Sequence, residues 1–225
     1  MGKTALVLGA TGLIGSHLLQ YLLELDNYEK VVVVGRRSCG VTHPKLTEHL
    51  FDFAQLEQHR NLLKANIVFC CLGTTLKKAG SKEAFKAIDY QIPLRAAKIA
   101  KENNTETFAL VSSIGADPES RFFYLKTKGE LELKLESLGF HSLLIFRPAG
   151  LLGDREEFRI KEVIGYIVAR ILSPLMIGPM KNSRPIEAGH VALVMASIPK
   201  NYIAGKKIYE SYNIQQLWND FTSKS

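Results

Sequence analysis

Continuous apolar runs alternate with helical patterns along the first part of the chain. The apolar runs are typical of buried strands and lie at Thr4–Gly9, Lys30–Gly35, Asn66–Leu72, Thr107–Ser112 and His141–Phe146, with a further short strand at Leu46–Phe51. Apolar residues recur with helical spacing at Leu13–Leu25, Leu56–Leu63, Lys82–Lys101 and Arg121–Leu138. Strands that are apolar on both faces and alternate with helices predict a parallel sheet covered on both sides.

The pattern changes after Pro148. Helices are predicted at Glu157–Leu172 and Ile186–Ile198, with a loop or short strand at Met176–Met180 between them and a short strand at Lys207–Glu210. A length of 225 residues fits one domain with a substantial core. We therefore expect one doubly wound α/β domain over residues 1–225, in which residues 149–225 form a small cap on the substrate side.

Composition fits an ordinary globular protein, with 46% hydrophobic and 23% charged residues. No apolar run reaches the length of a membrane span, and a strand rather than a signal peptide begins the chain. We therefore expect no membrane and a cytoplasmic location. The adjacent Cys70 and Cys71, with Cys39, make no disulfide framework and are interpreted as buried thiols, with a redox-sensing thiol as the alternative.

The formal net charge of +7 raises the question of an anionic partner. Basic residues are spread along the chain, and no RNA-binding or helix-turn-helix signature accompanies them. An anionic cofactor and a solvated basic surface explain the charge better than nucleic acid does. The six histidines have no metal-ligand spacing, so we expect no metal.

A glycine-rich segment, Gly9-Ala10-Thr11-Gly12-Leu13-Ile14-Gly15, joins the first predicted strand to the first predicted helix. A helix N-terminus offers free N–H groups and the positive end of its dipole, and missing side chains let phosphates approach. We predict that a dinucleotide pyrophosphate binds here, with contacts from Gly9, Thr11, Gly12, Leu13, Ile14 and Gly15. Turn and packing glycines of another α/β protein are the alternative.

Two arginines, Arg36 and Arg37, end the second predicted strand. An NAD-specific enzyme usually carries Asp or Glu there to hold the ribose hydroxyls, whereas a guanidinium pairs with a 2′-phosphate. The arginines therefore predict NADP(H), with Arg36 on the phosphate and Arg37 against the adenine. A solvated basic turn is the alternative.

A tyrosine and a lysine, Tyr124 and Lys128, are four residues apart in a predicted helix and so project from nearly the same face. A phenol beside an ammonium group has a lowered pKa and can donate a proton to a carbonyl oxygen. Ser112 and Ser113 precede this pair at the end of a predicted strand.

These motifs resemble those of the short-chain dehydrogenase/reductase superfamily, in which Ser, Tyr and Lys form the catalytic set beside a nicotinamide. Further segments resemble the atypical branch that includes the human Tat-interacting-protein oxidoreductase, over about Thr4 to Arg159: Gly35–Arg37, Cys70–Thr75, Ser112–Asp117, Tyr124–Glu130 and Phe146–Pro148. The resemblance implies that Tyr124 donates the proton, that Lys128 binds the nicotinamide ribose and that one serine binds the substrate oxygen. Ser113 is narrowly favoured over Ser112.

The same resemblance implies further cofactor contacts. Asp52 would accept a hydrogen bond from the adenine, and an ordinary loop carboxylate is an equal alternative. The remaining implied contacts are the ribose contacts of Leu72, Gly73 and Thr74, the nicotinamide contacts of Pro148 and Leu151, and Arg159.

Three functions remain open after the motifs are assigned. The first is NADP(H)-dependent redox chemistry on a carbonyl or alcohol group of a small molecule, by a monomer or homodimer. The second is an NADP(H)-binding regulator or sensor with little turnover. The third is an epimerase-like isomerase that uses bound NADP. The segment after Pro148 is shorter than the substrate lobe of sugar-nucleotide epimerases, which disfavours a nucleotide-sugar substrate.

Overall fold

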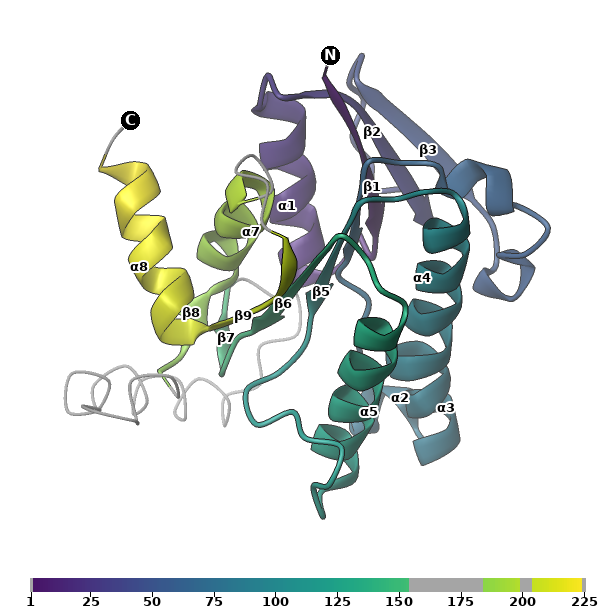
Figure 1. Cartoon of the computed structure of the whole chain (residues 1–225). Coiled ribbons are helices and arrows are strands. Elements are labelled where there is room, and N and C mark those ends of the chain that lie inside the picture. Colours follow the sequence, from purple (N-terminus) through teal and green to yellow (C-terminus); the bar gives the residue numbers. More distant parts are fainter. Residues whose placement is uncertain (1, 154–183, 199–203, 224–225) are drawn as a thin grey trace.

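A seven-stranded parallel sheet forms the centre of the computed structural model, which describes residues 2–153, 184–198 and 204–223 (Figure 1). The strand order is β3-β2-β1-β4-β5-β6-β9, and every neighbouring pair is parallel. The strands are β1 (Lys3–Leu8), β2 (Tyr28–Gly35), β3 (Leu46–Leu50), β4 (Ile67–Cys70), β5 (Thr107–Val111), β6 (Ser142–Arg147) and β9 (Gly205–Glu210). The predicted doubly wound sheet is confirmed.

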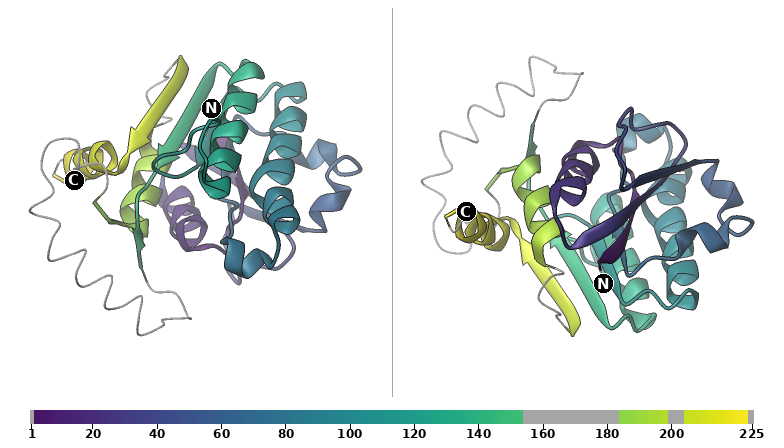
Figure 2. Two further views of the ribbon diagram at one scale, coloured as in Figure 1. Left: turned by 90° about the horizontal axis from the view of Figure 1, so that it is seen from below. Right: turned by 90° about the horizontal axis from the view of Figure 1, so that it is seen from above.

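Helices cover both faces of the sheet (Figure 2). One apolar core contains residues of α1 (Leu13–Glu24), α7 (Ala188–Ser197) and α8 (Ser211–Thr222). The other contains residues of α4 (Ile92–Glu102) and α5 (Phe123–Ser137). Strand β1 shows the alternation that divides them, because Ala5 and Val7 belong to the first core and Leu6 and Leu8 to the second.

Several helical segments differ from their sequence prediction. The predicted helix Lys82–Lys101 is divided into α3 (Lys82–Lys86), a π-helical turn η3 (Ala87–Gln91) and α4. Within the predicted helix Leu56–Leu63 the structure has a 3₁₀ helix, η2 (Arg60–Leu63), and another 3₁₀ helix, η1 (Phe53–Gln55), directly precedes this range. The short helix α2 (Leu76–Ala79) and the C-terminal α8 were not predicted. The segments Glu157–Leu172 and Met176–Met180 lie outside the described residues.

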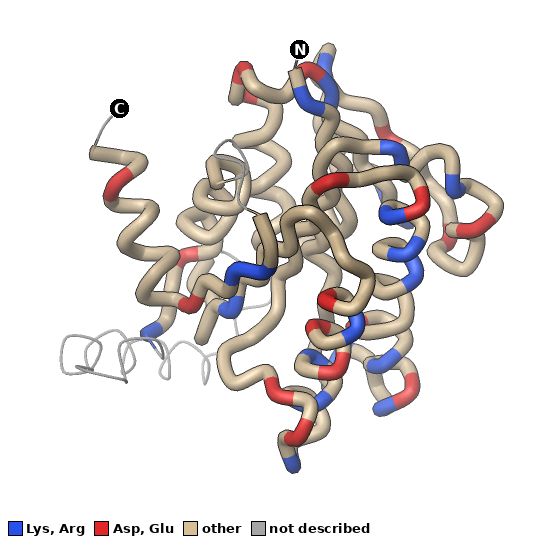
Figure 3. Tube along the Cα trace, in the orientation of Figure 1, with Lys and Arg blue, Asp and Glu red and all other residues tan. Residues whose placement is uncertain are grey.

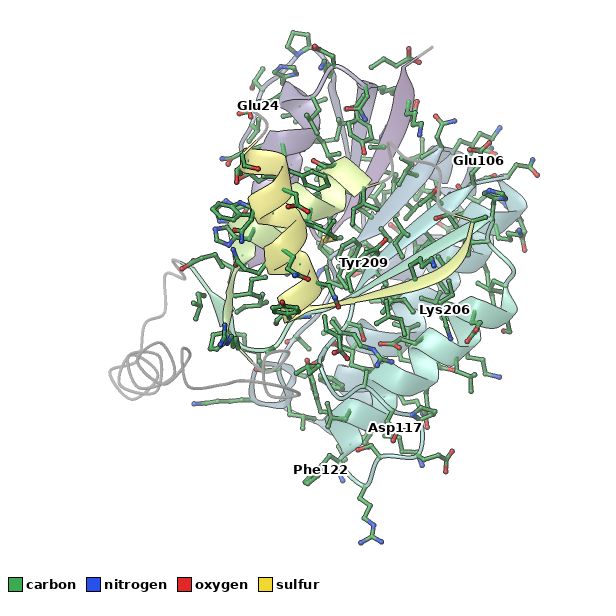
Figure 4. The ribbon with its side chains drawn as sticks, turned by 60° about the vertical axis from the view of Figure 1, so that its left-hand side comes forward. Glu24, Glu106, Asp117, Phe122, Lys206 and Tyr209 are labelled. Atoms are coloured by element: carbon green, nitrogen blue, oxygen red, sulfur yellow. The ribbon has the colours of Figure 1, made fainter. Side chains whose placement is uncertain are left out.

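The described residues after Pro148 extend the layers of the domain. Strand β9 pairs with β6 at one edge of the sheet, where Figure 4 labels its residues Lys206 and Tyr209. Helix α7 packs on α1, and α8 packs on α7. Two short strands, β7 (Leu151–Leu152) and β8 (Ile186–Glu187), form a separate parallel ladder. Among the helices described, none combines the length and apolar character that a membrane crossing requires.

Close packing of backbone against backbone, with no room for side chains, fixes the start of α1. A Cβ atom on Gly15 would lie 2.1 Å from the carbonyl oxygen of Gly9. Gly9 itself has φ +87°, and a Cβ there would lie 2.8 Å from the backbone of Cys71. Glycine is therefore required where β1, the turn and the end of β4 meet.

We expect Gly15→Ala to lower the free energy of unfolding by about 2–3 kcal/mol, because the added methyl group collides with backbone. Gly189→Ala in α7 is the matched control, since its Cβ would meet only the Tyr21 hydroxyl, at 3.8 Å. Alanine is a better helix former than glycine, so the free energy of unfolding of the control should rise by about 0.5–1 kcal/mol. Urea unfolding of both variants measures the difference, and equal stabilities would refute the backbone constraint.

Candidate functional site

The glycine turn and the first turn of α1 present backbone groups at the carboxyl edge of the sheet. Gly12 is the N-cap residue, no side chain caps it, and no acidic residue lies in the first turn. Thr11 and Gly12 are exposed and Leu13 is half-buried, whereas Ile14 and Gly15 are buried. The turn lies between β1 and β4, where the strand order reverses and doubly wound folds bind their ligands.

The predicted adenosine contacts follow β2 and β3. Arg36 and Arg37 are both exposed directly after β2. Asp52 is exposed after β3, and its Oδ1 accepts a hydrogen bond from the Ala54 N–H at 2.8 Å, which caps η1. One carboxylate oxygen of Asp52 therefore has a local structural role.

Helix α5 carries Tyr124, Lys128 and Glu132 at intervals of four residues, on one face. Lys128 and Glu132 are buried, and Tyr124 is half-buried with its ring centroid 5.5 Å from that of Phe85. Figure 4 labels Asp117 and Phe122, on the chain that leads into this helix. A Cβ on Gly129 would lie 2.3 Å from the backbone of Asp117, so this chain and α5 are in direct backbone contact.

A buried ion pair joins α5 to the π-helical turn. The Lys128 Nζ lies 2.7 Å from Asp89 Oδ1, and the two side chains are 4% and 0% exposed. The other oxygen, Oδ2, accepts a hydrogen bond from the Thr74 N–H at 2.8 Å. Burial raises the pKa of Asp89, and the neighbouring Lys128 opposes this shift. Asp89 thus connects the predicted ribose-binding lysine to the predicted ribose-binding backbone.

Gly73 lies directly beside this pair. A Cβ on Gly73 would be 3.4 Å from Asp89 Oδ1 and 3.7 Å from Lys128 Nζ. Gly73 is exposed, and Leu72 and Thr74 are half-buried. The end of β4 therefore leaves the predicted ribose site open above the ion pair.

The two candidate serines have different surroundings. The Ser112 hydroxyl is buried and donates a hydrogen bond to Glu132. The Arg147 guanidinium donates to both oxygens of Glu132, with Nε at 3.0 and 3.2 Å and Nη2 at 2.5 Å. Ser113 is half-buried, and its hydroxyl donates a hydrogen bond to the carbonyl oxygen of Ile114 at 3.3 Å. The Ser112 hydroxyl is thus part of a buried hydrogen-bond network, whereas Ser113 retains partial access to solvent.

Sequence reasoning missed Asp89, Glu132 and Arg147 as parts of this network. Glu132 continues the four-residue spacing of Tyr124 and Lys128, so that signal was present in the sequence. Asp89 lies within a predicted helix, and its burial depends on the π-helical turn.

The remaining predicted cofactor residues lie after β6. Pro148 is buried, and its carbonyl oxygen accepts a hydrogen bond from the Ile114 N–H at 3.1 Å. Leu151 is half-buried in β7. Arg159 lies outside the described residues.

The cysteines are free thiols. Burial raises the pKa of Cys70 to about 11 and also raises the pKa of Cys71. Both groups are therefore protonated at neutral pH. Within the described ranges, no cluster of three or more His, Cys, Asp or Glu residues has the geometry of a metal site.

Comparison with known proteins identifies the family. Residues 5–186 match the profile described as NAD dependent epimerase/dehydratase family. The chain belongs to this family. It is 39% identical over 161 residues to protein HTATIP2 of Rattus norvegicus, a match that covers 70% of this chain and 66% of HTATIP2. It is 40% identical over 226 residues to protein FMP52-1, mitochondrial, of Scheffersomyces stipitis, covering 96% of this chain and 98% of that protein.

Solved structures of other enzymes have the same fold. The Bordetella bronchiseptica enzyme WbmH in complex with NAD⁺ has a TM-score of 0.72 and 16% identity, covering 99% of this chain and 82% of WbmH. UDP-glucose 4-epimerase of Thermotoga maritima, solved with UDP-glucose, has a TM-score of 0.69 and 15% identity, with coverages of 98% and 82%. The resemblance inferred from the motifs is confirmed.

The expected cytoplasmic location is wrong. The fungal relatives of Candida albicans and Scheffersomyces stipitis, at 33% and 40% identity, are named mitochondrial.

We expect Asp89→Ala to lower the free energy of unfolding by about 3–5 kcal/mol, because it leaves the Lys128 ammonium buried without a partner. Adding Lys128→Met should restore most of the loss, since the uncompensated charge is then removed. Glu130→Ala is the matched control, because it breaks an exposed pair with Lys86 at 3.4 Å and should cost less than about 1 kcal/mol. Urea unfolding measures all three variants, and equal losses for Asp89→Ala and Glu130→Ala would contradict the buried pair.

Proposed function

We propose that this chain is an NADP(H)-dependent oxidoreductase of the short-chain dehydrogenase/reductase type, with residues 1–225 as one domain. Its substrate is a small molecule with a carbonyl or alcohol group. The observation that carries the proposal is the face of α5, where Tyr124 and Lys128 are one turn apart and the lysine is paired with Asp89 beneath Gly73.

The described residues fit a dinucleotide. Gly9 and Gly15 leave no side chain at the turn, and the exposed start of α1 offers uncapped N–H groups to a pyrophosphate. Lys128 uses Asp89 as one partner at 2.7 Å, and its remaining N–H donors are available to ribose hydroxyls. When bound, the nicotinamide supplies or accepts a hydride at the substrate carbon.

The chain's own residues supply the proton and bind the oxygen. In reduction, the Tyr124 hydroxyl donates its proton to the carbonyl oxygen as that oxygen gains charge, and oxidation reverses the transfer. We assign the hydrogen bond to the substrate oxygen to Ser113, since Ser113 is half-buried and makes only a long bond to the adjacent carbonyl oxygen, whereas the Ser112 hydroxyl is buried and bound to Glu132.

An isomerase that uses bound NADP is the second candidate, and the epimerase/dehydratase family match favours it. Such an enzyme oxidises and reduces the same substrate, so it has no net consumption of NADPH. A regulator or sensor binds the cofactor and also consumes little of it. Net oxidation of NADPH with small aldehydes or quinones therefore separates the oxidoreductase from both alternatives.

The exposed Arg36 and Arg37 support NADP(H) over NAD(H). We expect NADPH to bind at least about tenfold more tightly than NADH, which corresponds to about 1.4 kcal/mol. Arg36→Ala should weaken NADPH binding and leave NADH binding nearly unchanged, because only NADPH carries the 2′-phosphate. Calorimetric titration tests this, and equal losses for the two cofactors would exclude a phosphate contact.

We expect Tyr124→Phe to lower turnover of NADPH with a reactive quinone or aldehyde by about 10² or more, because a positioned acid is lost. NADPH affinity should be retained, since only one oxygen atom is removed. Tyr212→Phe in α8 is the control and should have wild-type turnover. A Tyr124→Phe enzyme with wild-type turnover would refute the catalytic role and favour a sensor.

A further inference from the structure

The loop that carries Arg36 and Arg37 is held by an acidic residue from the neighbouring strand. Glu48 lies in β3, which pairs with β2 so that Glu48 is opposite Val33. The chain between these strands, residues 36–45, has no helix or strand. The carboxylate of Glu48 therefore reaches this loop from a strand that the sheet fixes in place.

Three hydrogen bonds define the attachment. Glu48 Oε2 accepts from the Ser38 hydroxyl at 2.7 Å, and Glu48 Oε1 accepts from the Cys39 N–H at 2.8 Å. The Ser38 hydroxyl oxygen in turn accepts from the Gly40 N–H at 3.1 Å. The Cys39 N–H keeps the pKa of Glu48 below its usual value, so the carboxylate is ionised at neutral pH.

Arg36 and Arg37 directly precede the anchored residues and are exposed. A long exposed side chain on an unanchored loop loses both backbone and side-chain freedom when it binds a ligand. Anchoring the next two residues removes part of this cost before the ligand arrives. The lower cost applies to contacts that the arginines make, and of the two cofactors only NADPH carries the 2′-phosphate that pairs with a guanidinium.

We propose that Glu48 is a positioning residue that sets the preference for a 2′-phosphorylated cofactor by holding Ser38 and Cys39. The proposal rests on the proposed NADP(H) function. It assigns a specificity role to a carboxylate that makes no contact with the phosphate.

Two other roles for Glu48 predict different effects on cofactor binding. If its charge simply repelled the 2′-phosphate, removing the charge would strengthen NADPH binding. If the carboxylate accepted ribose hydroxyls, as an acid at the end of β2 does in NAD-specific enzymes, removing it would weaken NADH binding at least as much. Positioning predicts a loss that is confined to NADPH.

The test uses the full-length protein with Glu48→Ala and Glu48→Gln, titrated with NADPH and with NADH in a calorimeter. Glu48→Ala removes both acceptor atoms, so NADPH affinity should fall about tenfold and NADH affinity less than about twofold. Glu48→Gln removes the charge and keeps an oxygen acceptor for the Cys39 N–H, so its loss should be smaller than that of Glu48→Ala. Glu29→Ala at the other end of β2 is the control of equal charge change and should bind both cofactors as the wild type does.

Cys39 gives a readout that needs no cofactor. Burial and the hydrogen bond to Glu48 raise the pKa of this thiol. Glu48→Ala should therefore speed its alkylation by iodoacetamide several-fold, because the loop opens and the thiolate fraction rises. Peptide mass spectrometry separates Cys39 from the buried Cys70.

Faster alkylation of Cys39 together with a loss confined to NADPH supports the proposal. Unchanged alkylation in Glu48→Ala, tighter NADPH binding in both variants, or equal losses for the two cofactors would each overturn it. A wild-type protein that binds the cofactors equally or binds neither would refute the proposed NADP(H) function itself. If instead the wild type prefers NADPH and Glu48→Ala keeps the same preference, the NADP(H) function stands and only the role of Glu48 is refuted.

Discussion

The buried ion pair between Lys128 and Asp89 is the interaction on which the carboxyl edge of the sheet depends. The Lys128 side chain is only 4% exposed, and a buried ammonium group is destabilising without a partner. The carboxylate of Asp89, from another helical segment, is this partner at 2.7 Å. The same carboxylate holds the Thr74 N–H, which fixes the end of β4. Three segments far apart in sequence therefore meet at one charge pair.

A second charged network holds the same helix one turn further along. Glu132 binds the Arg147 guanidinium at the end of β6 and the Ser112 hydroxyl after β5. Helix α5 is thus attached through one face to the π-helical turn before α4 and, one turn further along, to the ends of β5 and β6. Gly129 packs against the backbone of Asp117, which further fixes α5 relative to the chain that follows β5.

Periodicity predicted the sheet well, because strands buried on both faces leave continuous apolar runs such as Val31–Val34. It failed for the π-helical turn at Ala87–Gln91, since one inserted residue barely alters a helical pattern over twenty positions. It also missed α8, where only Ser211 and Ile214 are buried. The four-residue spacing of the candidate residues on one helix was visible in the sequence, whereas the positions of Asp89 and Arg147 depend on contacts between distant elements. Basic residues are interspersed with acidic ones along the backbone tube of Figure 3, as their spread along the sequence suggested.

The packing of α7 on α1 has a consequence for how the chain is made. The Tyr28 hydroxyl donates to the Ala196 carbonyl oxygen across 168 residues of sequence, and β9 closes the sheet only near the C-terminus. During synthesis the ribosome therefore releases β1, α1 and β2 long before their apolar face has a cover. Such long-range closure slows folding and leaves the apolar surface of the nascent chain exposed until the later elements are made.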